Sequence, residues 1–117
     1  MPQSKLIEEI KGDVLGEKYD LSFAFISKKK IKELNKKFRK KDEPTDVLSF
    51  TLSKSSGEIL ICKEIAELKS KSFNMSAAEY LIFLVIHGML HLKGMRHGAK
   101  MESYEQIVYS RHRHRHL

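Results

Sequence analysis

The spacing of hydrophobic side chains divides the first half of the chain into helical and extended segments. Residues 21–26 combine alternation with aromatic side chains, which is typical of a strand. In residues 28–39 apolar side chains recur at intervals of three and four, which predicts an amphipathic helix with Ser27 as its N-cap. A weaker pattern of the same kind predicts a short helix over residues 4–15.

The second half begins with two further strands. Residues 46–52 and 57–62 have the composition of strands, and the serine-rich segment 53–56 predicts a hairpin turn between them. Residues 63–71 then follow the pattern of an amphipathic helix. We therefore expect three short strands, two of them paired in a hairpin.

The most hydrophobic segment of the chain is residues 77–92. Ser76 and Glu79 have the spacing of a capping box, so a helix is expected to begin directly after Ser76. Its side chains are apolar nearly all round, which predicts the buried central helix of the domain. One more helix is predicted over residues 101–109.

The length of 117 residues fits one domain, which we place at residues 1–110. The alternating arginines and histidines of residues 111–117 predict a disordered basic tail outside any site. The single Cys62 excludes an internal disulfide and suits a reducing compartment. No segment has the length of a membrane span or a signal peptide, so we expect a cytoplasmic protein without a membrane partner.

Charge indicates the class of partner. The chain has 22 Lys and Arg against 15 Asp and Glu, a net charge of +7. This excess favours a polyanion, and nucleic acid is the commonest polyanion in a cytoplasm. Basic proteins without such partners are also common. The net charge therefore indicates a nucleic-acid partner only in combination with a catalytic or binding mechanism.

Three histidines supply the candidate chemistry. His87 and His91 lie one helical turn apart on one face, so both imidazoles can reach one metal ion. In a continuing helix His97 would lie about 9 Å further along the axis and face away. Gly94 can end the helix in a left-handed conformation and return His97 to the same point. Three imidazoles with an open fourth position are typical of catalytic zinc.

Gly88 bears on which bond such a site can break. Zinc proteases with this histidine spacing have a glutamate directly after the first histidine, where it acts as general base. Gly88 stands at that place and has no side chain to accept a proton. Peptide hydrolysis by that mechanism is therefore disfavoured, whereas zinc can still act as a Lewis acid.

Two stretches of the sequence resemble one known family. Residues 87–97, His-Gly-Met-Leu-His-Leu-Lys-Gly-Met-Arg-His, resemble the signature His-Gly-x-Leu-His-Leu-x-Gly-Tyr-Asp-His of the bacterial YbeY endoribonucleases. The segments Asn35–Arg39, Pro44–Phe50 and Gly57-Glu-Ile agree independently and occur in the same order. Together the matching motifs cover roughly residues 31–98.

The resemblance implies a metal-dependent endoribonuclease specific for single strands, acting in ribosomal RNA maturation and ribosome quality control. It implies an α+β fold of zincin-like type, with a small mixed sheet packed against the central helix. By position, His87, His91 and His97 are the ligands of one zinc ion, and Arg39 is the catalytic arginine. Another divalent transition metal would accept the same imidazoles. The implied partners are single-stranded RNA and the ribosome or ribosome-associated proteins.

Arg39 also makes chemical sense without the resemblance. Negative charge builds on the phosphate oxygens during phosphodiester cleavage, and a guanidinium fork matches their geometry. Neighbouring cations would attract the RNA backbone irrespective of its sequence, although for the lysines a solvated helix end is an equally good interpretation. These candidate RNA-binding residues are Lys36, Lys37, Lys40, Lys41 and Arg96.

Five other residues near these motifs are expected to have structural rather than catalytic or binding roles. Phe38 and Phe50 are expected in the core, because aromatic side chains that stack on bases have to be exposed. Thr45 and Ser49 are expected to be turn and strand residues rather than nucleophiles. Asp46 has two interpretations, a group that orients or accepts a proton near the site and a cap before its strand, of which the second is favoured.

The chain departs from the family signature at one place, and two rival functions stay open. Met95-Arg96 replaces Tyr-Asp before the third histidine, which removes a carboxylate that could support the metal site. One rival is a ribosome-associated assembly factor with a structural metal. The other is a hydrolase of peptide or amide bonds, which would need a carboxylate near the metal from Glu58, Asp46 or Glu79.

Overall fold

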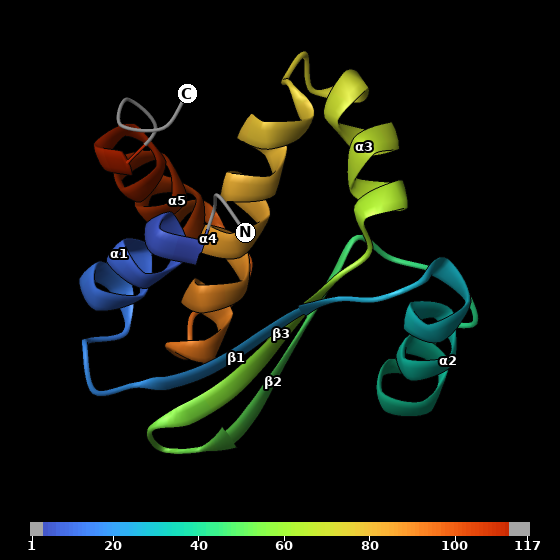
Figure 1. The fold of residues 1–117 in the computed structure, drawn as a ribbon, viewed down its shortest axis with the longest axis horizontal. Helices are drawn as coiled ribbons and strands as arrows, with labels where there is room; N and C mark the ends of the chain where they lie inside the picture. Colours follow the sequence, from blue (N-terminus) through green and yellow to red (C-terminus); the bar gives the residue numbers. More distant parts are fainter. Residues whose placement is uncertain (1–3, 113–117) are drawn as a thin grey trace.

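The computed structural model describes residues 4–112 as a mixture of helices and short strands (Figure 1). In chain order the elements are α1 (Ser4–Val14), β1 (Asp20–Phe25), α2 (Lys28–Arg39), β2 (Val47–Ser53), β3 (Ser56–Ile61), α3 (Lys63–Ser72), α4 (Ala77–Leu92) and α5 (Ala99–His112). Every predicted element is present, and α2 and α4 have the predicted bounds.

β3 is the middle strand of the sheet. It pairs in parallel with β1 and antiparallel with β2, so the strand order is β1-β3-β2. The hairpin expected between β2 and β3 is confirmed. The resulting mixed sheet against a long central helix confirms the α+β fold. It also leaves β2 at an edge, next to the site described below.

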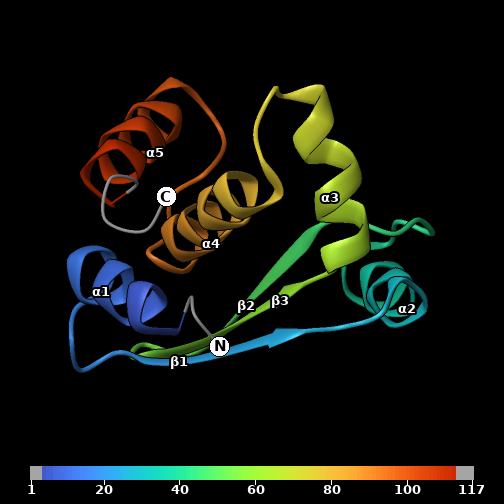
Figure 2. The same ribbon diagram turned by 45° about the horizontal axis from the view of Figure 1, so that its top comes forward.

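α4 is the central helix and lies against one face of the sheet, where it contacts β2 and β3. α1 and α5 lie on the same side of the sheet as α4 and cover the helix from outside (Figure 2). The main core forms between Ile59 and Ile61 of β3 and the apolar side chains of α4, among which Ile86 and Met89 are fully buried. The predicted burial of this helix is confirmed.

Gly88 is a place where α4 packs closely on the sheet. A Cβ atom at this position would lie 3.0 Å from both Ile59 Cδ1 and Ser49 Oγ. The Ser49 hydroxyl also donates a hydrogen bond to the Gly88 carbonyl at 3.3 Å. A side chain at this position would require Ile59 and Ser49 to shift, so the close contact between α4 and the sheet favours glycine here.

α2 packs on the sheet through a second, smaller cluster, away from α1 and α5 (Figure 1). Ile31, Leu48 and the free thiol Cys62 are buried in it. The expectation that Phe38 packs in the core is wrong, because its residue surface is 51% exposed. Phe38 lies in the last turn of α2, past the buried part of the helix, and packs with Phe50, which is half-buried.

α5 extends beyond its predicted end and includes the first two residues of the expected tail. Arg111 and His112 are helical, and both bind the carboxylate of Asp13 at the end of α1, with His112 Nε2 2.9 Å from Asp13 Oδ2. For these two residues the expected disorder is corrected, because the contact with Asp13 holds the end of the helix. Residues 113–117 of the predicted tail lie outside the described residues.

Among residues 4–112, no single helix is long and apolar enough to cross a membrane. α3 and α4 have that length and composition only when taken together, and they are bent at 107° relative to each other.

Candidate metal centre

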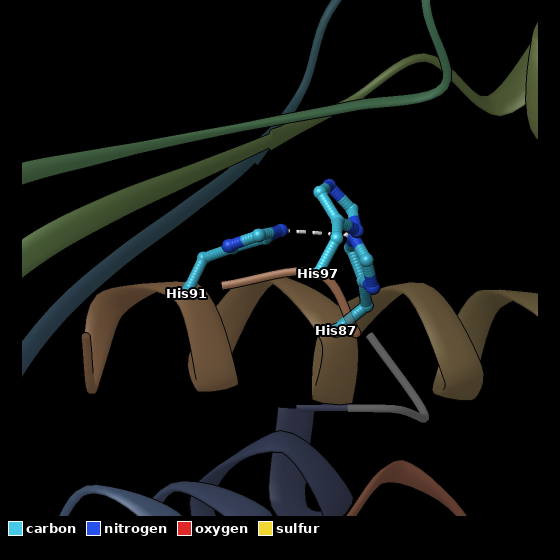
Figure 3. A group of neighbouring side chains, drawn as sticks. All are labelled: His87, His91 and His97. Atoms are coloured by element: carbon cyan, nitrogen blue, oxygen red, sulfur yellow. Dashed lines mark hydrogen bonds between the residues drawn. The ribbon is translucent and has the colours of Figure 1, made fainter. Parts of the chain in front are cut away.

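The three predicted histidines meet at one point (Figure 3). His87 and His91 project from the same face of α4, and His97 reaches them from the loop before α5. One nitrogen of each ring lies within 4.8 Å of the others, and the Nε2 atoms of His87 and His91 are 3.1 Å apart. Two nitrogens bound to one tetrahedral zinc are roughly 3.3 Å apart. The pair on α4 therefore already has nearly the spacing that a shared metal ion requires.

Gly94 ends α4 and brings His97 close to His87 and His91, as the sequence analysis predicts. The residue has a φ of +103°, in the left-handed region that glycine tolerates. The Gly94 amide donates to the carbonyl of His91 at 2.9 Å, and the Met95 amide donates to that of Leu90 at 3.0 Å. These two bonds form a Schellman motif, which ends α4 and reverses the chain.

The other nitrogens of the histidines on α4 are held by the protein. His91 Nδ1 donates to the Met95 carbonyl at 3.0 Å, so its Nε2 carries the lone pair that a metal needs. His87 Nδ1 lies 3.2 Å from Oε2 of Glu105, a buried carboxylate on α5. This arrangement is typical of metal-binding histidines, so the donor set fits a bound divalent transition metal.

Glu105 was missed by the sequence analysis. It occupies the buried side of α5 together with Met101 and Val108, at helical intervals of four and three residues. A carboxylate on an otherwise apolar helix face is a signal that the sequence did contain, since such a group needs a polar partner. Glu105 supplies a carboxylate that supports a histidine ligand from outside the donor set. From the sequence alone, such a carboxylate was expected to be lost where Met95-Arg96 replaces Tyr-Asp.

The environment of His91 favours its neutral form. Burial lowers the pKa of the imidazole below its usual value, and positive charge on His87, His97 and Arg39 lowers it further, while the hydrogen bond to Met95 opposes the shift. Metal ions bind the neutral imidazole, so this shift keeps His91 competent as a ligand to lower pH.

Arg39 lies in the same cleft as the histidines, at the end of α2. Its guanidinium donates to the backbone carbonyl of Ser49 on the edge strand β2 at 2.8 Å. The guanidinium carbon also lies 5.1 Å from the centre of the Phe50 ring. These contacts hold the guanidinium group of Arg39 in place, while the residue as a whole is exposed to solvent.

The cleft has a volume of about 820 Å³ and runs between α4, the edge strand β2 and the loop before it. Of the predicted RNA-binding cations, Lys41 lines the cleft itself. Lys36, Lys37 and Lys40 are exposed at the end of α2, and Arg96 is exposed in the loop that carries His97. Lys69 on α3, which the sequence analysis did not select, also lines the cleft.

Asp46 lines the cleft but is held by structural contacts. The buried hydroxyl of Tyr80 donates to its Oδ2 at 2.8 Å, and Lys69 Nζ lies 3.6 Å from the same oxygen. Burial raises the pKa of the Tyr80 hydroxyl, and the hydrogen bond and charge of Asp46 raise it further. These contacts support the structural interpretation of Asp46.

The other two carboxylates considered for an amide hydrolase do not line the cleft. Glu79 closes the capping box of α4 with Ser76. Glu58 lies on β3, paired with Phe50 across the sheet. Glu105 contacts His87 at Nδ1, on the opposite side of the ring from the Nε2 that faces His91. No one of these groups has the place of the protease glutamate.

Comparison with known proteins gives a consistent result. The sequence matches the family model described as Endoribonuclease YbeY over residues 3–114. A protein of that name from Thermotoga neapolitana is 37% identical over 110 residues, which cover 93% of this chain and 73% of the relative. Another from Phytoplasma australiense is 38% identical over 102 residues, 80% of this chain and 70% of the relative.

A third relative of the same name, from Thermotoga petrophila, is 41% identical over 93 residues, or 78% of this chain. The match spans 61% of that relative, so across the three proteins the chain corresponds to between 61% and 73% of their lengths. A solution structure of a Thermotoga maritima protein has a similar fold, with a TM-score of 0.64 and 31% identity. That match covers 90% of this chain and 77% of the other.

Proposed function

This chain belongs to the endoribonuclease YbeY family, and on that basis we propose that it is a metal-dependent endoribonuclease that cleaves single-stranded RNA, with ribosomal RNA as its substrate. The observation that carries the proposal is the convergence of His87, His91 and His97 in a cleft that also contains Arg39. The cleft thus combines a donor set for a Lewis acid with a cation suited to phosphate.

The three histidines would hold one Zn²⁺ ion. When bound, this ion supplies Lewis acidity toward a phosphate oxygen or a water molecule. Glu105 and the Met95 carbonyl orient the imidazoles of His87 and His91 through their Nδ1 atoms. The Schellman motif at Gly94 positions the third imidazole from the loop.

Arg39 would stabilise the charge that develops on the non-bridging phosphate oxygens. Its planar fork can donate two parallel hydrogen bonds to a phosphate, and one nitrogen is already positioned by the Ser49 carbonyl. Lys41 and Lys69, which both line the cleft, would attract the RNA backbone and make binding sensitive to salt.

Gly88 supports RNA rather than a peptide or amide as the substrate. Gly88 stands where a zinc protease has its general base, and the close contact of α4 with Ile59 and Ser49 favours a residue without a side chain there. A phosphodiester does not require that glutamate, because the positively charged groups of the cleft act on the phosphate itself. We also propose a cytoplasmic location and association with the ribosome, in keeping with a ribosomal RNA substrate.

The proposal is tested by cleavage of a labelled single-stranded RNA, with the metal content of every protein measured in parallel. The wild-type protein is expected to cut the RNA, and His91→Ala is expected to lose metal and activity together. Arg39→Glu is expected to keep its metal and lose activity. Equal cleavage by all three proteins would reveal a contaminating nuclease. No cleavage by metal-loaded wild type would favour the assembly factor with a structural metal.

A further inference from the structure

A partly exposed pair of aromatic rings lies at the border of the cleft. Phe38 on α2 and Phe50 on β2 pack edge to face, with ring centres 5.3 Å apart and planes at 68°. Phe50 lines the cleft together with the three histidines. Phe38 extends this apolar surface outward, and half of its residue surface is accessible. Burial in the core does not account for an exposed phenylalanine at this place.

The surroundings of the pair are strongly basic. The Arg39 guanidinium lies over the Phe50 ring, and Lys37 Nζ lies 5.3 Å from the centre of the Phe38 ring. Lys36, Lys40 and Lys41 lie near the same end of α2. An apolar ring set among cations suits a ligand that has both a flat aromatic part and a nearby negative charge.

We propose that Phe38 and Phe50 form a subsite that stacks one unpaired nucleobase of the RNA next to the cleavage site. The inference rests on the proposed function, and it identifies the group that distinguishes single strands from duplexes. A base in a duplex has both faces covered by its neighbours, so only an unpaired base can offer a face to Phe38. The phosphates flanking that base would lie among Lys37, Arg39 and Lys41.

A test separates stacking from backbone attraction by using two short RNA strands of equal length and charge. One strand carries a single 2-aminopurine among uridines, and the other has an abasic ribose at that position. Dissociation constants are measured with metal-loaded full-length protein, and electrophoresis verifies that the strands stay intact. Stacking is expected to quench the 2-aminopurine fluorescence and to favour the base-containing strand about fivefold or more.

Two variants of Phe38 assign this preference to its ring. Phe38→Leu keeps an apolar side chain against Phe50 but has no aromatic face, and it is expected to remove most of the preference. Phe38→Tyr keeps the ring and is expected to retain the preference. Phe73→Leu is the matched control, because Phe73 is an exposed phenylalanine outside the cleft that also packs on an aromatic ring, that of Tyr80.

The inference is overturned if wild type binds both strands equally, or if Phe38→Leu weakens both by the same factor. Either result would favour a protein partner at this surface or a purely electrostatic role. Cleavage of a longer RNA by the same wild-type preparation is measured alongside. Cleavage without base preference overturns the subsite alone, whereas base preference without cleavage overturns the nuclease and retains the subsite as a binding site.

Discussion

Glu105 Oε2 lies 3.2 Å from Nδ1 of His87, so a buried carboxylate on α5 supports the imidazole of a candidate metal ligand on α4. The two residues are 18 positions apart and belong to different helices. This contact gives the site an outer carboxylate even though the chain has Arg96 where the family signature has an aspartate. It also makes α5 part of the candidate metal centre.

The first prediction concerns this contact. Glu105→Gln is expected to weaken zinc binding by about 10- to 100-fold, because an amide supports the imidazole less well than a carboxylate. Zinc affinity is measured by competition with a chromophoric chelator. Glu102→Gln, an exposed position on the same helix, is the control and should bind zinc like wild type. Equal affinities for wild type and Glu105→Gln would show that the carboxylate does not support the metal.

The second prediction concerns the close packing at Gly88. Gly88→Ala is expected to lower the free energy of unfolding by about 1 kcal/mol, because the new methyl group contacts Ile59 and Ser49 too closely for the helix propensity of alanine to compensate. Gly12→Ala in α1 is the matched control. Its Cβ would meet Glu17 Cγ at 3.7 Å, so the same change should stabilise the protein slightly. Urea titrations of both variants check the difference, and a stabilised Gly88→Ala would contradict it.

The third prediction concerns the turn at Gly94. Gly94→Ala is expected to cost about 1–2 kcal/mol of stability, because alanine is strained at positive φ, and to weaken zinc binding by displacing His97. Gly16→Ala provides the comparison, since Gly16 has a similar φ of +99° and lies outside the site. Both variants should unfold at lower temperature, but only Gly94→Ala should bind zinc less tightly. If the two variants bind zinc equally, the position of His97 does not depend on this turn.

The fourth prediction is a pH dependence at the contact between α1 and α5. Burial alone would raise the pKa of Asp13, but its hydrogen bonds and charge interactions with His112 and Arg111 lower the pKa below its ordinary value of 3.8. A depressed carboxylate pKa stabilises the folded state above pH 3.8, and this contribution is lost as the pH falls through the lower, folded-state pKa. Asp13→Asn is therefore expected to cost about 1 kcal/mol at pH 7.

The same substitution should cost progressively less stability below about pH 4. Thermal unfolding of wild type and Asp13→Asn across pH 3–7 measures this convergence. Asp42→Asn serves as the control, because Asp42 is exposed and its ion pair with Lys36 is 3.9 Å long, so little effect is expected at any pH. A constant difference between wild type and Asp13→Asn over the whole range would contradict the assignment.

The sequence predicted those elements whose ends are determined locally. Ser27 accepts a hydrogen bond from the Lys30 amide, and Ser76 and Glu79 form the full capping box, so α2 and α4 begin where expected. The histidine site was predictable for the same reason, since one helical turn and the glycine at position 94 determine its geometry. These signals all lie within a few residues of the groups they position.

Features that depend on distant contacts were predicted less well. The solvent exposure of Phe38 depends on where α2 passes the end of the sheet, which the helical pattern alone does not reveal. The contact between His87 and Glu105 joins two helices, and the binding of Arg111 and His112 to Asp13 joins the two ends of the described chain. Parallel pairing of β1 with β3 is likewise set by tertiary packing rather than by either strand.

The position of His97 between α4 and α5 links metal occupancy to the assembly of the C-terminal part of the domain. A metal ion bound by the triad would connect the loop directly to α4, while Glu105 connects α5 to the same cluster. Because coupling between two sites is reciprocal, a change that loosens α5 would weaken metal binding at the histidines, and removal of the metal would loosen α5. The salt bridge between Asp13 and Arg111, which involves none of the three histidines, would thereby become an indirect determinant of metal affinity.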